Sequence, residues 1–387
     1  MAMLRVYRNL DELVAIRPAW DELLAHYPSV TTFSTWEWLS CWWRSFGTDQ
    51  QLLVLAWFEG NSLLGLAPLS ISTERRAGFS FRVLRLMGDG SNDSDNLDMP
   101  VQPGCEQEFA ANVLRYLQEH KHDWDICELN TMPQDSLAGR CLHRLSASPG
   151  WTCFTYPSRC SAVHLPETWE SYLGSLSSED SKNLARYTRR LESRYATRIY
   201  RCTEQNELPA KLESLFRLHQ ERWQGAGEPG SFSSPERREF YFRLSECLLE
   251  RRRLELWVLE LDGEIAAVQF AFRHGDRVFQ LQEGYDSTKK SDRLGFVLRG
   301  AVLKQLISDG IRIYDFLGGE DPYKARWGAQ ESHYRNLHFA PALGVGGMWL
   351  QFVDKAGKSK NWLRQNLPSS AWRLLQSAND AFQERQS

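Results

Sequence analysis

The sequence predicts a mixed α/β protein built from two copies of one unit. Apolar runs of strand length, separated by glycine turns, alternate with segments of helical periodicity. The order of these elements also recurs: a hairpin around Gly60 corresponds to one around Gly263, and a third strand, a helix and a fourth strand follow in both places. A chain of 387 residues with 42% apolar content is long enough for roughly two to three domains. We therefore expect two α/β units with their sheets side by side, breaking near residues 166 and 208.

Composition excludes several classes of protein. A formal net charge of −3 argues against broad binding of duplex nucleic acid. The eight cysteines form no C-x-x-C pair and have no companion histidine spacing, so we expect neither a zinc site nor a disulfide framework, and no bound metal. The N-terminal residues carry no apolar signal region, and no apolar run reaches the length of about eighteen residues that a membrane helix needs. These features predict a cytoplasmic protein.

The N-terminal part begins with a predicted strand at residues 4–7 and helical segments at 10–26, interrupted at Pro18. A tryptophan-rich helix follows at 36–46, and Gly47 ends it. So many tryptophans could form a ligand platform, but aromatic side chains at helical spacing favour a place in the core.

The first copy continues with a hairpin, a third strand, a helix and a fourth strand, which we predict at 52–58 and 62–72, 82–87, 105–120 and 124–129. Between the third strand and the helix lies the sequence G-D-G-S-N-D-S-D-N-L-D. Its aspartates suggest a calcium loop, but the glycine and terminal glutamate of an EF-hand are missing at the required spacing. We therefore interpret it as a polar turn.

A basic helix is predicted between the copies, at residues 181–195. Leu184 and Leu191 share one face, and the opposite arc carries Lys182, Arg186, Arg189, Arg190 and Arg194. This arc is either a solvated face or a dock for phosphates or an anionic acceptor. The predicted organisation is an N-terminal unit at 1–165, a helical linker with a basic face at 166–207, a C-terminal catalytic unit at 208–345, and a helical tail at 346–387.

The fourth strand of the second copy leads into D-F-L-G-G-E-D-P-Y-K-A-R-W-G, residues 315–328. A buried strand ends there at two glycines, and Pro322 stands where a proline opens a helix. Strand ends followed by helix starts are where α/β proteins keep their chemistry. The alternative is a strand exit followed by a capped, solvated helix.

Hairpin, central strand, loop, helix and strand, in this order, resemble the acyl-CoA-binding core of GNAT-type N-acyltransferases. A closer resemblance covers nearly the whole chain and is carried by F-S-T-W-E-W-L-S-C-W-W-R-S-F-G, G-N-S-L-L-G-L-A-P-L, G-D-G-S-N-D and D-F-L-G-G-E-D-P-Y-K-A-R-W. These strings resemble the tandem-GNAT acyltransferase family associated with bacterial cellulose and exopolysaccharide biosynthesis. That family resembles the Fem-type aminoacyl-tRNA:peptidoglycan transferases, whose lysine corresponds to Lys324. The loop S-T-K-K-S-D-R-L-G-F departs from the Ser-Pro-Gly usual in the family.

The resemblance implies an N-acyltransferase that uses acyl-CoA as co-substrate and a small-molecule or glycan-precursor amine as acceptor. Two alternatives remain open. One is aminoacyl transfer from charged tRNA, favoured by the basic helix and Lys324. The other is a non-catalytic accessory of an exopolysaccharide synthase, and peripheral association with an envelope or polysaccharide synthase is compatible with either.

Such an enzyme needs a phosphate site, a strand edge for the pantetheine, a base for the amine and polarisation of the carbonyl. We predict catalytic roles for Asp315 as first candidate base, with Glu283 and His219 behind it, for Tyr285 or Tyr323 as acid, and for Lys324. For acyl-CoA binding we predict Gln282, Gly284, Lys289, Lys290, Arg293, Leu294 and Gly295. For acceptor binding we predict Arg222, Trp223, Glu320, Asp321 and Trp327. Copy one lacks this equipment, so we expect one catalytic centre, in copy two, facing the cleft between the copies.

Overall fold

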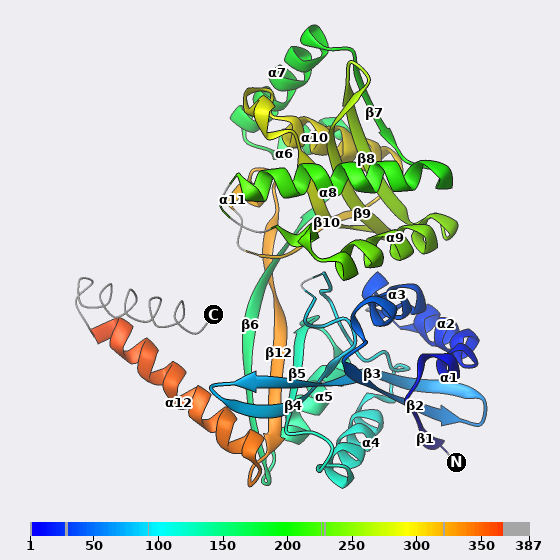
Figure 1. Ribbon diagram of the computed structural model, residues 1–387, viewed down its shortest axis with the longest axis vertical. Helices are drawn as coiled ribbons and strands as arrows, with labels where there is room; N and C mark the ends of the chain where they lie inside the picture. Colours follow the sequence, from blue (N-terminus) through cyan, green and yellow to red (C-terminus); the bar gives the residue numbers. More distant parts are fainter. Residues whose placement is uncertain are drawn as a thin grey trace.

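The computed structural model describes residues 2–366 except 28, 29, 92, 226, 228, 229, 320 and 321, with side chains up to residue 356. The predicted site residues Glu320 and Asp321 lie outside the described residues. So do the apolar residues predicted to pack in the tail, from Leu367 onward, and the side chains of Trp362 and Leu363. Figure 1 shows two lobes connected by a long two-stranded ribbon.

The first copy forms the lower lobe of Figure 1. Its strands are β1 (Ala2–Tyr7), β2 (Gln50–Glu59), β3 (Ser62–Arg76), β4 (Phe79–Leu86) and β5 (Ile126–Met132). Its helices are α1 (Leu10–Val14), α2 (Arg17–His26), η1 (Thr32–Ser34), α3 (Trp36–Phe46), α4 (Glu106–Glu119) and α5 (Leu137–Ser146). The predicted capping pair at the first helix is confirmed, because Asn9 accepts a hydrogen bond from the amide of Glu12.

The second copy forms the upper lobe and repeats this order. Its strands are β7 (Thr197–Arg201), β8 (Leu254–Leu261), β9 (Glu264–His274), β10 (Arg277–Tyr285) and β11 (Ile313–Gly318). Its helices are α6 (Trp169–Ser175), α7 (Ser178–Arg194), η2 (Gln205–Glu207), α8 (Leu208–Gln224), η3 (Ser231–Ser233), α9 (Pro235–Glu250), η4 (Ser287–Asp292), α10 (Leu294–Ser308) and α11 (Pro322–Ala325). Both hairpins turn at a glycine with positive φ, Gly60 and Gly263, which confirms the predicted repeat.

Two long strands cross between the copies. β6 (Trp151–His164) follows copy one but pairs with β11 of copy two, and β12 (Gln330–Pro341) follows copy two but pairs with β5 of copy one. The two strands also pair with each other along most of their length. The result is one twelve-stranded sheet in the order β1-β2-β3-β4-β5-β12-β6-β11-β10-β9-β8-β7. The expectation of two separate sheets is therefore wrong: the copies are halves of one sheet, because each donates a strand to the other.

The tryptophan helix α3 belongs to the core, as predicted. Trp38 and Trp42 are no more than 1% exposed, and Trp38 makes ring contacts with Phe240 and Phe272 of copy two. One apolar core therefore continues from copy one through α3 into the α8–α9 layer of copy two. A second core lies under α10, on the other face of the copy-two sheet. The last helix, α12 (Val345–Asn366), packs on the ribbon of β6 and β12 and then leads away from the lobes (Figure 1).

Candidate active site

Strands β10 and β11 separate to form a V-shaped opening. They pair in parallel only over residues 277–279 and 313–315, and beyond that β10 continues to Tyr285 with β9 as its partner. The register of β10 against β9 shifts between Gln280 and Gln282, which marks a bulge. Bulges bend a strand and re-aim its side chains, often next to active sites. The opening gives the end of β10 a free edge on the side of β11.

A cavity of about 590 Å³, which we call the splay cavity, lies at this opening. It is walled by the end of β10, the start of α10 and the segment of α11. Predicted residues that line it are Arg222, Glu283, Tyr285, Lys289, Lys290, Arg293, Leu294, Gly295, Tyr323 and Trp327. The structure thus brings together most of the residues that we predicted for donor binding, along with several predicted for catalysis and acceptor binding.

The outer end of the splay cavity is a cationic helix start. Arg293 has φ +54° and directly precedes α10, whose first turn carries no acidic residue and has no side-chain cap. A left-handed residue after the helical turn η4 is the arrangement of a backbone nest for anions, and the helix dipole adds to it. Lys290 and Lys289 stand beside this start, and Lys289 is paired with Asp286. The equivalent helix of copy one, α4, has glutamates in its first turn, which oppose an anion there.

The inner end holds a buried ion pair. Glu283 pairs with Arg299, and Arg299 is only 3% exposed. Oε1 of Glu283 also lies 3.7 Å from a guanidinium nitrogen of Arg222. The guanidinium of Arg299 lies 5.0 Å from the ring centre of Tyr323 and 5.7 Å from that of Trp327. Burial lowers the pKa of Arg299, but Glu283, Tyr314 and Tyr323 together raise it above its usual value. The guanidinium therefore stays charged inside the cavity wall.

Sequence reasoning missed Arg299. Its signal is a lone arginine within the apolar run L-G-F-V-L-R-G-A-V-L, because a charged residue in a buried helix must have a partner.

Other predicted residues lie on the opposite face of β10, against α8. A Cβ at Gly284 would lie 2.8 Å from the backbone nitrogen of His219 and 2.9 Å from the carbonyl oxygen of Leu215, so this glycine permits the close approach of the helix. His219 is 2% exposed, and burial lowers its pKa to about 4. Its Nε2 accepts a hydrogen bond from Trp223 Nε1 at 3.0 Å. Gln282 also faces His219 rather than the splay cavity.

We expect Gly284→Ala to lower the free energy of unfolding by about 1–3 kcal/mol, because the added methyl meets backbone atoms that cannot rotate away. Urea denaturation measures this change. The control is Gly174→Ala, because a Cβ at Gly174 would have no atom within 4 Å and the substitution should be nearly neutral. Gly310→Ala is not a suitable control, since Gly310 has a φ of +80°. A neutral Gly284→Ala would show that α8 does not approach β10 this closely.

Asp315 and Lys324 do not line the splay cavity. Asp315 lines a second cavity, of about 460 Å³, where its Oδ2 lies 3.3 Å from Arg277, and burial raises its pKa. Lys324 is 5% exposed, and its Nζ donates to the carbonyl oxygens of Gly318 (2.7 Å), Gly319 (3.1 Å) and Phe316 (3.4 Å). Its ammonium therefore holds the turn that follows β11.

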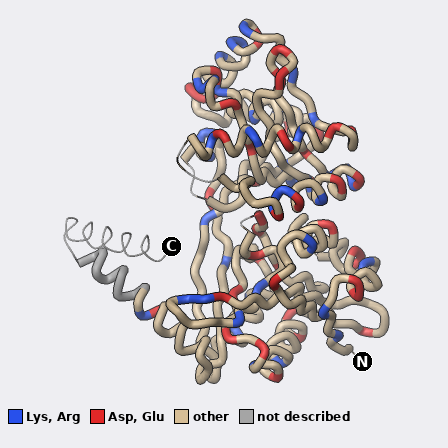
Figure 2. Tube along the Cα trace, in the orientation of Figure 1, with Lys and Arg blue, Asp and Glu red and all other residues tan. Residues whose placement is uncertain are grey.

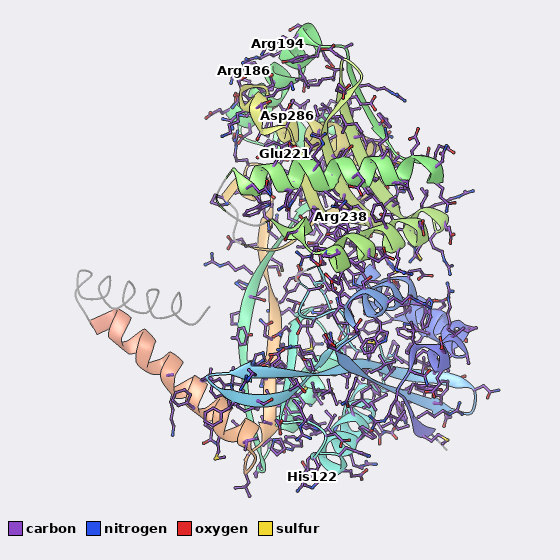
Figure 3. All side chains as sticks on the ribbon, viewed as in Figure 1. His122, Arg186, Arg194, Glu221, Arg238 and Asp286 are labelled. Carbon is purple, nitrogen blue, oxygen red and sulfur yellow. The ribbon has the colours of Figure 1, made fainter. Side chains whose placement is uncertain are left out.

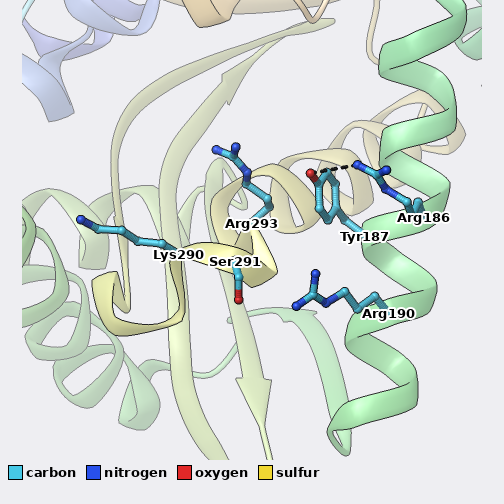
Figure 4. A pocket seen from close by; sticks show the side chains of 6 residues that line it. All are labelled: Arg186, Tyr187, Arg190, Lys290, Ser291 and Arg293. Atoms are coloured by element: carbon cyan, nitrogen blue, oxygen red, sulfur yellow. Dashed lines mark hydrogen bonds between the residues drawn. The ribbon is translucent and has the colours of Figure 1, made fainter.

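A basic pocket of about 640 Å³ opens next to the splay cavity, between α7 and the start of α10 (Figure 4). Its lining is Arg186, Tyr187, Arg190, Lys290, Ser291 and Arg293. Three of them, Arg293, Lys290 and Tyr187, also line the splay cavity, so the basic pocket and the splay cavity adjoin. Lys and Arg recur along α7 in Figure 2, and Figure 3 places Arg186, Arg194 and Asp286 together in the upper lobe.

The predicted basic helix is thus present as α7, and its cations are exposed. Arg194 and Arg190 pair with the buried Asp292 of η4, which fastens the helix to the loop below it. A hydrogen bond from Arg186 lowers the pKa of the Tyr187 phenol.

Within the described part of the chain, His, Cys, Asp and Glu form no group of three or more arranged to hold a metal ion. Across the same residues, every helix is too short or too polar to cross a membrane. All eight cysteines are free thiols.

Residues 178–325 match the family model of the acetyltransferase (GNAT) domain. No curated protein matched the sequence. Among solved structures, the fold is similar to FemX, with a TM-score of 0.59 and 11% identity over 87% of this chain and 98% of that one. It is also similar to L-PGS from Bacillus licheniformis, with a TM-score of 0.52 and 10% identity over 90% and 96% of the two chains. A tandem GNAT protein from the clavulanic acid biosynthesis pathway matches with a TM-score of 0.50 and 13% identity over 88% and 99%.

The chain therefore has a tandem GNAT-like fold, as predicted, and residues 178–325 match the acetyltransferase (GNAT) domain. The GNAT match begins with the first residue of α7 and ends with the last residue of α11, so it contains the basic pocket and all residues that line the splay cavity except Arg326 and Trp327. At these identities the solved structures establish the fold alone.

Proposed function

We propose that this protein is an N-acyltransferase that transfers an acyl group from acyl-CoA to an amine. The observation that carries the proposal is the splay cavity, which joins a cationic helix start to the carboxylate of Glu283 and the phenols of Tyr285 and Tyr323. A donor with a pyrophosphate at one end and a thioester at the other needs this combination of groups. The GNAT match over the same residues supports it.

At the outer end, Arg293, Lys290 and the first amides of α10 would bind the pyrophosphate through charge-assisted hydrogen bonds. The free edge of β10 would pair with the amide groups of the pantetheine, since its backbone has no β11 partner there. A backbone amide of the same strand would polarise the thioester carbonyl. Gly295 leaves room for this arrangement, because a Cβ there would lie 3.2 Å from the ring of Tyr285.

At the inner end, the amine nitrogen would attack the thioester carbon. The C–N bond forms, the C–S bond breaks, and the amine gives up a proton to a base. Glu283 is the carboxylate that lines the cavity, so we assign it this role, directly or through one water. Tyr285 and Tyr323 also line the cavity, and either phenol could protonate the departing thiolate.

We assign the chemistry to copy two and a structural role to copy one. The counterpart of the cationic helix start in copy one is α4, which begins with acidic residues. Glu128 of β5 is held by Arg76 and Arg85 in a cluster of ion pairs and does not line the splay cavity. The motif resemblance suggests an amino sugar or a polysaccharide precursor as acceptor, and a role in exopolysaccharide or cell-envelope synthesis.

A second candidate is aminoacyl transfer from charged tRNA. The observation that favours it is the basic pocket, which extends the cationic surface from the start of α10 onto α7. A pyrophosphate does not need so wide an area, whereas a nucleic-acid backbone does. Similarity of the fold to FemX and L-PGS is compatible with this alternative.

Arg293→Glu tests the donor site. We expect it to weaken acyl-CoA binding by about 10- to 100-fold, since it replaces a charge-assisted contact by repulsion. Isothermal titration calorimetry with acetyl-CoA and a long-chain acyl-CoA measures the effect, with Arg189→Glu as control. Arg189 is exposed on α7 and lines neither cavity.

Unchanged affinity in Arg293→Glu would place the donor elsewhere. If the wild-type protein does not bind acyl-CoA but binds aminoacyl-tRNA with an affinity that depends strongly on salt, the second candidate is supported instead.

A further inference from the structure

The sequence G-D-G-S-N-D-S-D-N-L-D, residues 88–98, forms a loop of copy one that faces copy two. We call it the aspartate loop. Its end is fixed within copy one: Asp98 is buried and accepts hydrogen bonds from Tyr27 and from Ser136, the latter at 2.6 Å. The hydrogen bonds of Asp98 thus hold the C-terminal end of the aspartate loop in copy one. Its four aspartates, two of them buried and two partly buried, accept hydrogen bonds from other parts of the chain.

Two contacts carry the loop into copy two. Asp93 is 1% exposed and accepts from Arg237 at 2.9 Å and from Tyr241 at 3.0 Å, both on α9. Asn96 donates to the hydroxyl of Tyr334 on β12 at 3.1 Å. These bonds set the position of the loop against both the helical layer and the ribbon of copy two.

Between these anchors, Asp95 reaches the turn at the end of β11. Its Oδ2 accepts a hydrogen bond from the amide of Gly318 at 2.9 Å. A Cβ at Gly318 would lie 3.3 Å from the same oxygen, so a glycine there lets the carboxylate approach. The preceding residue, Leu317, has φ +60°, a conformation that costs free energy for a side chain of its size. The turn therefore depends on outside contacts to keep its shape.

Lys324 holds the same turn from the other side, through its bonds to the carbonyl oxygens of Gly318 and Gly319. The residues on either side of the lysine form one wall of the splay cavity: Tyr323 and Trp327. This segment, 322–327, we call the α11 wall. Burial raises the pKa of Asp95 to about 6, while the Gly318 amide and the charge of Lys324 lower it, and Asp315 and Asp89 raise it.

We infer that Asp95 is a positioning residue for acyl transfer: a carboxylate of copy one holds the turn that places the α11 wall over the splay cavity of copy two. The inference rests on the proposed function for its kinetic part. It gives copy one a task in the reaction although we assign the donor site and the chemistry to copy two. Asp95 touches neither donor nor acceptor in this account and acts only through the turn at Gly318.

Hydrogen–deuterium exchange measured by mass spectrometry tests the structural part without any substrate. We expect Asp95→Ala to raise the exchange rate of the segment 316–328 about tenfold, the effect of losing one partly buried hydrogen bond. Asp95→Asn should keep the rate near that of the wild type, because an amide oxygen can still accept from Gly318. Leu13→Ala is the stability control, since this fully buried leucine lies in the core of copy one, on α1. It should lower the melting temperature without changing exchange at 316–328.

Kinetics with acyl-CoA and an amine tests the functional part. We expect kcat to fall about tenfold in Asp95→Ala, with KM for acyl-CoA within about twofold of the wild type, and to recover in Asp95→Asn. Unchanged exchange in Asp95→Ala, or altered exchange with full kcat, overturns the inference. Wild-type protein that neither binds nor uses acyl-CoA overturns the proposed function instead, and the exchange data still decide whether Asp95 holds the wall.

Discussion

Glu283→Gln is expected to lower turnover about 100-fold or more while acyl-CoA affinity stays within about twofold, because a general base contributes that much to proton transfer and little to ground-state binding. The substitution keeps the size of the side chain and an oxygen that can accept from Arg299. It removes the negative charge that lies between Arg299 and Arg222. Steady-state kinetics and calorimetry on one preparation separate the two quantities.

The matched control is Glu221→Gln. Glu221, labelled in Figure 3, is an exposed carboxylate on α8. It pairs with Arg217, and its loss should leave turnover unchanged. The melting temperature of Glu283→Gln must also be measured, since Arg299 is buried and loses its counter-charge. A folded Glu283→Gln variant with full turnover would remove Glu283 as the base. Asp315→Asn would then be the variant to measure, as Asp315 was the first candidate from the sequence.

Lys324→Met is expected to lower the free energy of unfolding by about 3 kcal/mol, since the substitution leaves the carbonyl oxygens of Phe316, Gly318 and Gly319 without the charged donor of a buried side chain. Turnover should fall about tenfold with it, because the α11 wall depends on the same turn. Methionine keeps the length of the lysine stem, so the change reports on the ammonium group. Chemical denaturation and acyl-transfer rates provide the two numbers.

Lys304→Met on α10 is the control for Lys324→Met, because Lys304 is exposed and should change stability by no more than about 0.5 kcal/mol. Two results would contradict the structural role. A change in stability as small as that of the control would show that the ammonium of Lys324 does not stabilise the turn and behaves as an exposed cation. A loss of turnover of about 100-fold at unchanged stability would mean that its ammonium acts on the substrate itself.

Local pattern was enough to predict most elements of this fold. The hairpins around Gly60 and Gly263 follow from strand periodicity and a turn residue that tolerates positive φ. The exchange of β6 and β12 could not be predicted in this way. A strand with a given alternation can pair with the last strand of either copy, and only the packing of the whole chain decides between them.

In the candidate site, too, features that depend on local sequence were predictable and features that depend on packing were not. The cationic start of α10 was predictable, because Lys290 and Arg293 are charged whatever surrounds them. The face of the sheet on which Asp315 lies was not predictable. On β11 its side chain points away from that of Tyr314, which is fully buried in the core under α10. The sequence marks Arg299 as a lone charge in an apolar run, but it does not show that the partner of this charge is Glu283.

The exchanged strands bear on how the chain is made. When copy one leaves the ribosome, the edge of β5 has no neighbour, because the strand that pairs with it, β12, begins only at residue 330. An unpaired edge in a nascent protein invites pairing with other chains. Copy one therefore completes its sheet only after β12 has been synthesised, and until then one edge of β5 stays open.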